Sequence, residues 1–411
     1  MGRLIWSFGL IVLIVGWLPP AALADDWDSC VSENADVSIF GCTAIIDAGT
    51  ESKKNNAIAY FNRGLGYYKN DDYDRAIEDL DRSVTLDPKS SKSHNLRGNI
   101  YYMRKEYDRA IKSYDKAIAL NSKYADPHHM RGRVLSIKKD YDLAIKSFDR
   151  AIAINSKYAA AYDDRGTAYW NKEDQERALK DFDKSIEINP EYGIAYVDRG
   201  ALYFAKGDLV RALKDFDKAI ALDPKHALAY RYRGAVRNKN RDFDTAIRDY
   251  EEAITLDPRD PLAYFFRGNA YYSKGDYVSA IDDFDEAIAL NSEDADFYYN
   301  RGETYLSKGE YENAIKDFDE TIARNPKSVL AYRRRGDAYV KKHEHERAIK
   351  DFDEAIALDP KYAPAYNGRG NAYLGKDRYE LAIKDYNEAI ELDPKFALAF
   401  SNRGLTLYKK G

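Results

Sequence analysis

Hydrophobic and polar positions repeat every 34 residues along most of the chain. Counted from Ala57 as position 1, a ring at position 4, a glycine at position 8 and usually a tyrosine at position 11 are four and three residues apart, which places them on one face of a helix. Positions 20, 21, 24, 27 and 28 give a second helix a face of the same kind. Each copy of the pattern therefore predicts two amphipathic helices.

Short polar segments separate the two expected helices of a copy. Pairs such as Gly207-Asp208 and Gly275-Asp276 supply a turn residue followed by one suited to cap the next helix. A copy typically closes on Leu-Asp-Pro or Leu-Asn-Ser. Where proline is present, it ends the second helix because it donates no amide and disfavours a helical predecessor. The unit is thus a helix-turn-helix.

An Arg-Gly pair occupies positions 7 and 8 of every copy without a shift in register. Residues 57–396 make ten full tandem copies, and residues 397–411 make half of one. A unit of this size buries its core only between neighbouring copies, so we expect one continuous array. The half copy is either the polar cap of the array or the cut end of a longer one. The eleven arginines are Arg63, Arg97, Arg131, Arg165, Arg199, Arg233, Arg267, Arg301, Arg335, Arg369 and Arg403.

Small residues recur where two helices must approach closely. Position 8 is glycine in all eleven copies and position 20 is alanine in all ten full ones, whereas position 24 is Phe, Tyr or, once, Leu80. We expect the side chain at position 24 to fill a hole that the glycine and alanine leave open. Replacing Gly200 or Ala212 by a bulky residue should cost about 1–3 kcal/mol through overpacking.

These residues at this period resemble the tetratricopeptide repeat over residues 57–411. The resemblance implies an all-α fold, a right-handed superhelical solenoid of helix-turn-helix repeats whose first helices line a concave groove. Two positions depart from the family pattern. The usual Trp at position 4 is Tyr in most copies and histidine at His94 and His128, and the usual Leu at position 7 is always Arg.

The arginine at position 7 requires a partner of opposite charge. Position 23 is Asp in eight of ten full copies, with Ser113 and Ser147 as the exceptions, and position 25 is acidic in nearly all. We expect each arginine to pair with a second-helix carboxylate of its own or the preceding copy, because a guanidinium satisfies several acceptors at once. The alternative is an exposed row of cations that binds an anionic ligand.

Composition and motifs argue against several function classes. The 411 residues carry 64 Lys+Arg and 69 Asp+Glu, and no run of like charge suggests a surface for nucleic acid or anionic membrane. No phosphate loop, nucleophile elbow or HExxH helix occurs. We therefore expect no catalysis and no cofactor, since an enzyme would need a further domain beyond Gly411. We expect no metal at the H-x-H of His343 and His345, which lies in a turn.

Residues 1–24 have the features of a secretory signal peptide. Arg3 precedes an apolar run from Leu4 to Leu18, and a small-x-small cleavage pattern ends at Ala24. We expect cleavage there and export of the rest, to the periplasm or outside the cell, with no stable membrane insertion. The alternative is an uncleaved anchor, but the apolar run is shorter than the ~20 residues that span a bilayer.

Residues 25–56 form an N-terminal capping segment that contains the chain's two cysteines, Cys30 and Cys42. In an oxidising compartment the pair is best explained as one disulfide, worth roughly 3 kcal/mol in the loop-entropy account. Two buried free thiols, or a metal site without a nearby His, are the alternatives. Residues 37–48 match the second-helix pattern, so we expect a lone helix that packs on the first copy, with the disulfide joining the preceding segment to it.

Positions that vary among copies indicate the expected binding surface. In the family that the repeats resemble, positions 2, 5, 9, 12 and 13 of the first helices face the ligand. Positions 5, 9 and 12 change from copy to copy while the packing positions do not. Aromatic residues among them would make an apolar strip with a polar rim for an extended or helical peptide, although the rings at position 12 would serve equally well in packing. The candidate groove residues are Asn95, Asn99, Asp163, Thr167, Trp170, Phe204, Arg231, Phe265, Asn269, Tyr272, Tyr299 and Arg333.

We therefore expect a non-catalytic scaffold or adaptor of the cell envelope that binds proteins or peptides in its concave groove. The alternative is a structural assembly factor that contacts envelope polymers or complexes through its outer surface. Loss of partner recovery by Trp170→Ala and Phe265→Ala variants would favour the groove.

Overall fold

The computed structural model describes residues 22–411, in which short turns connect helices and no strand occurs. Of the expected signal segment, residues 1–21 lie outside this described part. Two compact units divide the chain between Ala195 and Tyr196. The helices before the boundary are α1 (Ala22–Cys30), α2 (Ala35–Ala48), α3 (Lys53–Lys69), α4 (Tyr73–Leu86), α5 (Ser91–Met103), α6 (Tyr107–Leu120), α7 (Ala125–Ile137), α8 (Tyr141–Ile154), α9 (Ala159–Asn171) and α10 (Gln175–Ile188).

The boundary falls within α11 (Gly193–Ala205). The helices of the second unit that follow are α12 (Leu209–Leu222), α13 (Ala227–Lys239), α14 (Phe243–Leu256), α15 (Pro261–Lys274), α16 (Tyr277–Leu290), α17 (Ala295–Lys308), α18 (Tyr311–Arg324), α19 (Val329–Lys341), α20 (His345–Leu358), α21 (Ala363–Leu374), α22 (Tyr379–Leu392) and α23 (Ala397–Lys410).

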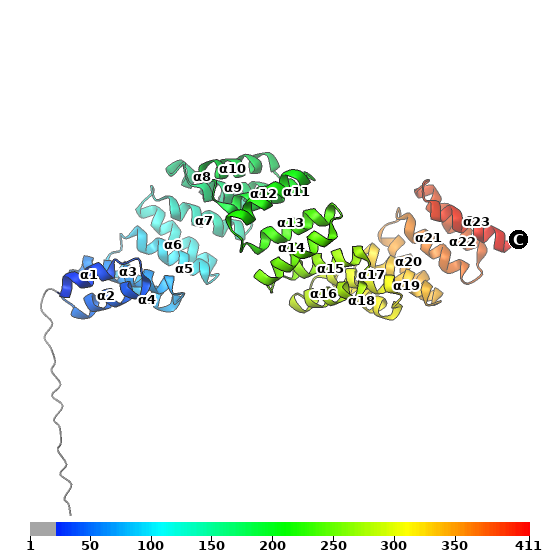
Figure 1. The fold of residues 1–411 in the computed structure, drawn as a ribbon, viewed down its shortest axis with the longest axis horizontal. Coiled ribbons are helices and arrows are strands. Elements are labelled where there is room, and N and C mark those ends of the chain that lie inside the picture. Colours follow the sequence, from blue (N-terminus) through cyan, green and yellow to red (C-terminus); the bar gives the residue numbers. More distant parts are fainter. Residues whose placement is uncertain (1–21) are drawn as a thin grey trace, which may run out of the picture. The chain divides into compact units, whose positions relative to one another are not determined.

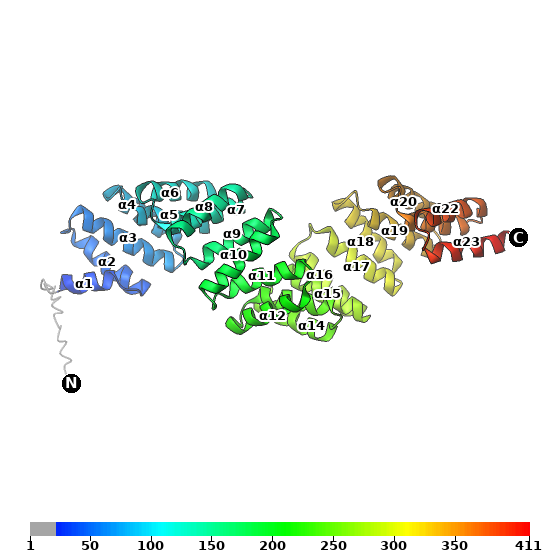
Figure 2. The same ribbon diagram turned by 90° about the horizontal axis from the view of Figure 1, so that it is seen from above.

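Neighbouring helices pack in chain order within each unit. In the first unit α3 contacts α4 and α4 contacts α5, and in the second unit α15 contacts α16 and α16 contacts α17. First helices of adjacent copies also meet, as α5 does with α7 and α17 with α19. Successive helices accordingly lie side by side in both views of each unit (Figure 1; Figure 2). The fold is an all-α repeat solenoid, as the pattern of apolar positions predicts.

The core of each copy is the ring at position 24 seated against the glycine at position 8. A Cβ added to Gly98 would lie 2.5 Å from Cε1 of Tyr114, and one added to Gly336 would lie 2.8 Å from Cε1 of Phe352. Both rings are fully buried. The expected ring-in-hole packing is confirmed, and it explains why no side chain is present at position 8 in these copies.

The turn inside each copy contains one residue in the left-handed backbone region. Gly207, Gly275 and Gly309 have φ of 78°, 82° and 85°. The next residue then caps the second helix, as Asp208 does by accepting the backbone amide of Arg211 at 3.0 Å. Non-glycine residues adopt this conformation in the other copies, at a cost of about 1–2 kcal/mol each: Asp71, Lys105, Lys139, Glu173, Arg241, His343 and Asp377.

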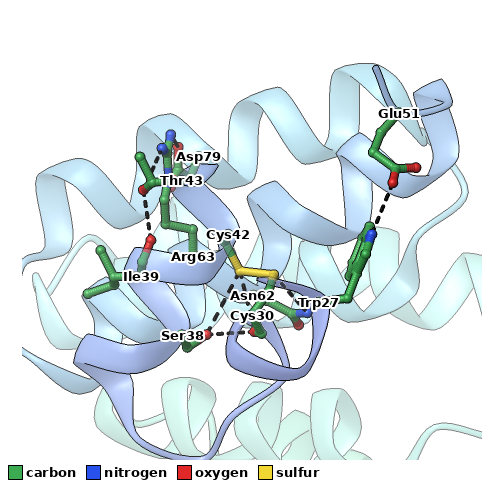
Figure 3. Close-up of a disulfide and its surroundings, with 10 residues drawn as sticks. All are labelled: Trp27, Cys30, Ser38, Ile39, Cys42, Thr43, Glu51, Asn62, Arg63 and Asp79. Carbon is green, nitrogen blue, oxygen red and sulfur yellow. Dashed lines mark hydrogen bonds and ion pairs between the residues drawn. A yellow bond between two sulfur atoms is a disulfide. The ribbon is translucent and has the colours of Figure 1, made fainter. Parts of the chain in front are cut away.

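The N-terminal segment forms a helix pair joined by the disulfide of Cys30 and Cys42, with an S–S distance of 2.03 Å (Figure 3). Ser38 Oγ donates to the carbonyl of Cys30 at 2.8 Å, which fixes the end of α1 against α2. The expectation of a lone helix was wrong, because the segment before it is itself α1 and packs on α2. Helix α2 in turn packs on α3, so the disulfide lies in the apolar core of this end.

Candidate protein-binding cleft

The position-7 arginines form a ladder of ion pairs along the repeats. In Arg335, Nε and Nη2 donate to the two carboxylate oxygens of Asp351 at 2.8 and 2.7 Å, and Nη1 donates to Asp319 of the preceding copy at 2.5 Å. Both carboxylates lie 16 residues from the arginine, one on each side along the chain. The guanidinium therefore joins two consecutive second helices, with three charge-assisted hydrogen bonds.

The expected ladder is confirmed for the arginines that test it. Arg165 binds Asp181 and Asp149 in the same way, and Arg199 binds Asp215 through Nε and Nη2. Burial alone would lower the pKa of the Arg165 guanidinium, but the hydrogen bonds and charge of Asp181 raise that pKa above its ordinary value. These arginines are paired with carboxylates of the repeats, so they do not form the exposed row of cations considered as the alternative.

A cleft of about 700 Å³ opens among the first helices of the second unit. It lies along α15, α17, α19 and α21, and residues from four consecutive copies line it. Because adjacent first helices contact each other directly, the cleft is a feature of one continuous surface. Its lining includes Tyr272, Glu303, Leu306, Ser307, Arg334, Asp337, Val340, Lys341, Gly368, Asn371 and Leu374.

Two pairs of oppositely charged side chains lie at the centre of this cleft. Arg334 Nη2 lies 2.6 Å from a carboxylate oxygen of Glu303, and Arg333 Nε lies 3.1 Å from a carboxylate oxygen of Asp337. Burial raises the pKa of Glu303 above the ordinary value for a carboxyl, and the charge of Arg334 opposes this. Burial would lower the pKa of Arg334, but Glu303 and Tyr299 raise it. The two pairs are thus held in a partly dehydrated environment.

Three buried polar atoms at this centre lack a hydrogen-bond partner within the described residues: Oε1 of Glu303 and the Nε atoms of Arg333 and Arg334. Of these residues Glu303, an acceptor, and Arg334, a donor, line the cleft. Unsatisfied buried polar atoms are costly and therefore rare. Leu306, Val340 and Leu374 add apolar surface to the same lining. The cleft thus combines one free acceptor, one free donor and an apolar wall, which is what a peptide segment requires.

The candidate groove residues of the first unit are mostly engaged within the protein. Asn95 is buried and donates to the Tyr124 hydroxyl at 3.2 Å, and Asn99 accepts from the Tyr114 hydroxyl at 2.9 Å. Asp163 is also buried. Thr167 and Trp170 remain partly exposed. Asn99 is partly exposed as well, so three of these five candidates present surface.

Candidate residues of the second unit are all partly exposed, and they differ in their contacts. Phe265 lies against Phe284 and Phe297 with ring centroids 5.9 and 5.0 Å apart, and the Tyr299 ring lies 5.8 Å from that of Phe318. Arg231 pairs with Asp260 at 2.8 Å.

The other candidates of this unit have fewer such contacts. Tyr272 lines the cleft, Arg333 lies 3.1 Å from Asp337, and Lys239 lies over the ring of Phe204. Of the aromatic candidates in this unit, Phe265 and Tyr299 are therefore engaged with neighbouring rings, whereas Tyr272 lines the cleft.

The repeat pattern could identify some of the residues that line the cleft. Glu303, Asp337 and Asn371 occupy position 9, one of the variable positions already assigned to the groove. Arg334 and Gly368 occupy position 6, which the repeat pattern did not assign to the surface. The available signal was the run of four polar residues in successive copies at position 9, from Asn269 to Asn371.

Metal-binding groups and membrane spans are two features that the described residues lack. Within 22–411, no group of three or more His, Cys, Asp or Glu side chains is arranged to hold a metal ion. No helix in that range combines the length and apolar character needed to cross a bilayer.

Comparisons with known proteins identify the repeats. Family models described as tetratricopeptide repeat match residues 57–125, 125–158, 159–192, 193–226, 299–363 and 363–396. A model described as TPR repeat matches residues 241–275 and 268–309. No curated protein matches the chain.

Among solved structures, the Cut9-Hcn1 hetero-tetramer of the APC/C is 17% identical, with a TM-score of 0.47 over 93% of this chain and 95% of that one. YrrB, described as a TPR protein with an unusual peptide-binding site, is 24% identical, with a TM-score of 0.41 over 46% of this chain and 97% of that one. Pseudomonas aeruginosa pilF is 20% identical, with a TM-score of 0.47 over 53% of this chain and 100% of that one. The family matches, which together span most of residues 57–396, show that the chain belongs to the tetratricopeptide repeat family.

Proposed function

We propose that this protein is a non-catalytic scaffold of the cell envelope that holds a peptide segment of a partner protein in the cleft of α15, α17, α19 and α21. Tetratricopeptide repeats are protein-interaction modules, so a protein or peptide partner follows from the family. The family does not specify the binding surface or the cellular location, and these are the two further parts of the proposal.

The unsatisfied pair of Glu303 Oε1 and Arg334 Nε carries the proposal. A peptide main chain offers both complements, since its amide donates to the carboxylate oxygen and its carbonyl accepts from the guanidinium. Such hydrogen bonds are strong where water is excluded. An apolar side chain of the same peptide would lie against Leu306, Val340 or Leu374.

Export to the periplasm or beyond rests on two observations. The apolar run from Leu4 to Leu18 precedes a cleavage pattern, and Cys30 and Cys42 are joined in a disulfide, which persists in oxidising compartments. Fractionation of the native host tests this part. Recovery of the protein with the cytosolic fraction, with both thiols free, would contradict it.

Site-specific photo-crosslinking in living cells tests the cleft. A benzophenone side chain at Leu374, inside the cleft, should give adducts with a discrete partner. The same group at Leu290, exposed at the end of the second helix α16, serves as the control and should give none. Glu303→Gln and Arg334→Met should reduce the adduct at position 374, whereas Glu286→Gln on exposed α16 should not.

The opposite pattern would overturn the proposal. Adducts at position 290 alone would favour the alternative of an assembly factor that uses its outer surface. Adducts at position 374 that persist in both charge variants would mean that the Glu303–Arg334 pair does not recognise the partner.

A further inference from the structure

Two consecutive copies of the first unit lack the carboxylate that completes the ladder elsewhere. Position 23 is serine at Ser113 and Ser147, whereas it is Asp in the other eight full copies. Beside Ser147, a cleft of about 720 Å³ opens on the side of the second helices α6 and α8. This cleft shares no residue with the proposed peptide cleft of the second unit, so a ligand bound here is independent of a peptide bound there.

Arg131 is incompletely paired in this cleft. Its Nε donates to Asp115 of the preceding copy at 2.7 Å, and its Nη1 donates to Ser147 Oγ at 2.8 Å. Its Nη2 has no hydrogen-bond partner among residues 22–411. In Arg335 both Nε and Nη2 are bound by Asp351. The serine at position 23 thus occupies one guanidinium nitrogen, whereas the aspartate occupies two.

Further cations line the same cleft without a carboxylate partner. Lys146 and Arg150 on α8 line it and form no ion pair within the described residues. Its two carboxylates are already engaged, Asp115 by Arg131 and Asp149 by Arg165. Burial is the main cause of a lowered pKa at His128, which also lines the cleft, and the charges of Arg131 and Arg150 add to it. The lining therefore has an excess of positive charge.

The corresponding cleft of the eighth copy contains more carboxylates. There the corresponding cleft, of about 510 Å³, contains Asp317 at position 23 and Glu320 at position 26. Asp317 binds Arg301 and Glu320 binds Arg324, so each of these carboxylates is paired with a cation. In the third copy these two positions are Ser147 and Arg150. At these two positions the third copy thus has no carboxylate, whereas the eighth copy has two that are paired with cations.

We propose that the cleft lined by Arg131, Lys146, Ser147 and Arg150 binds a compact oxyanion, the carboxylate or phosphate group of a ligand. The oxyanion supplies the negative charge that aspartate supplies in other copies: it accepts from Nη2 of Arg131, while Ser147 Oγ keeps its bonds to Arg131 Nη1 and to the Leu143 carbonyl. Lys146 and Arg150 neutralise its charge from α8. Ion-pair and hydrogen-bond donors grouped in a recess are the usual means of holding such groups.

Calorimetric titration of the purified protein tests the site, with inorganic phosphate and N-acetylaspartate as separate probes at constant ionic strength. Each probe that binds should do so with one equivalent per chain. Ser147→Asp restores the residue found in eight copies, and Arg150→Glu reverses the charge at position 26. Each should weaken binding at least tenfold, while Ser292→Asp, the same charge change in an exposed turn, should leave it unchanged.

A gain-of-site variant separates binding from any loss of folding. Asp317→Ser combined with Glu320→Arg recreates the composition of the third copy in the eighth, and should add a second equivalent of the bound probe. Competition between the two probes at one site would show general oxyanion binding, and binding of one alone would identify the source. Binding of neither probe, or binding that Ser147→Asp leaves intact in a folded protein, would overturn the proposal.

Discussion

Removing Arg335 and removing Asp351, the two members of one ladder pair, should lower the free energy of unfolding by unequal amounts. The side chains of Arg335 and Asp351 are 18% and 8% exposed, so each is largely withdrawn from water. Arg335→Met leaves Asp351 buried without its cation, a situation that costs about 3–5 kcal/mol. Asp351→Ser leaves an arginine that still binds Asp319. Two hydrogen bonds to a charged group are lost, at about 1.5 kcal/mol each.

The third copy indicates that an Asp351→Ser protein would recover part of the free energy lost with these two hydrogen bonds. Arg131 remains bound to Asp115 and reaches the serine at position 23. We therefore expect Asp351→Ser to cost about 2 kcal/mol, clearly less than Arg335→Met. Because the two side chains interact directly, the double variant should cost less than the sum of the single ones, by about 1–3 kcal/mol.

Acidification should relieve the penalty of Arg335→Met. Burial already raises the pKa of Asp351 in the folded protein, with Arg335 as the main opposing influence. Without that cation the folded-state pKa rises further above the unfolded value. A carboxyl shifted in this direction costs stability above its folded-state pKa, and the cost disappears as the pH falls through that value. The difference from the parent protein should therefore shrink as the pH falls from the raised folded-state pKa of Asp351 towards its unfolded-state pKa.

Hydrogen exchange read by mass spectrometry is the suitable assay, since repeat arrays open locally rather than as a whole. Protection of the α19 and α20 amides reports the local free energy of opening, and urea unfolding followed by circular dichroism gives an independent value. An Asp351→Ser cost equal to or greater than that of Arg335→Met would refute the reasoning, as would strict additivity in the double variant.

Three further outcomes are expected from packing, backbone conformation and the disulfide. Gly336→Leu should cost about 1–3 kcal/mol, because its first side-chain carbon already meets Phe352 at 2.8 Å, and thermal unfolding measures this. Lys139→Gly should raise stability by about 1 kcal/mol in urea unfolding, because Lys139 has a φ of 62°. Replacing Cys30 and Cys42 by Ser should cost roughly 3 kcal/mol for the α1–α2 end, measured as lost amide protection in α1.

Each of these outcomes has a specific contradiction. A Gly336→Leu protein as stable as the parent would show that the ring of Phe352 moves aside freely. A less stable Lys139→Gly protein would mean that side-chain contacts in the turn outweigh backbone strain. Unchanged protection of α1 in the double serine variant would show that the apolar core around Ile45 is sufficient to hold the two helices together.

The repeat pattern predicted the parts of the structure that every copy shares. Period, ring-in-hole packing and the Arg–Asp pairs recur along one sequence, so internal comparison serves in place of an alignment. The pairing of Arg165 with both Asp181 and Asp149 could be anticipated because both carboxylates recur at fixed spacing. Positions that are the same in every copy are those that the contact between neighbouring copies requires.

The groove was predicted less well, for reasons of local packing. Phe265 varies among copies, as a ligand-facing residue should, yet its ring fills space between Phe284 of its own copy and Phe297 of the next. Variation at position 5 therefore reflects pairwise repacking at each junction. The charged cleft depends on Arg334 at position 6, which varies from copy to copy, and a periodic pattern carries no information about the residue at such a position.

The ladder also bears on how many copies such a chain can contain. Each complete rung has one partner 16 residues before the arginine and another 16 residues after it, as Arg165 has in Asp149 and Asp181. Each such 34-residue copy therefore carries the arginine, the position-23 carboxylate that this arginine binds, and the position-25 carboxylate that the arginine of the next copy binds. Excising or duplicating a whole copy restores the same bonds at the new joint, so the number of copies can change in evolution without redesign of the fold. Surface features built from several copies, such as the clefts at Ser147 and Glu303, would instead be lost when any one of their copies is excised.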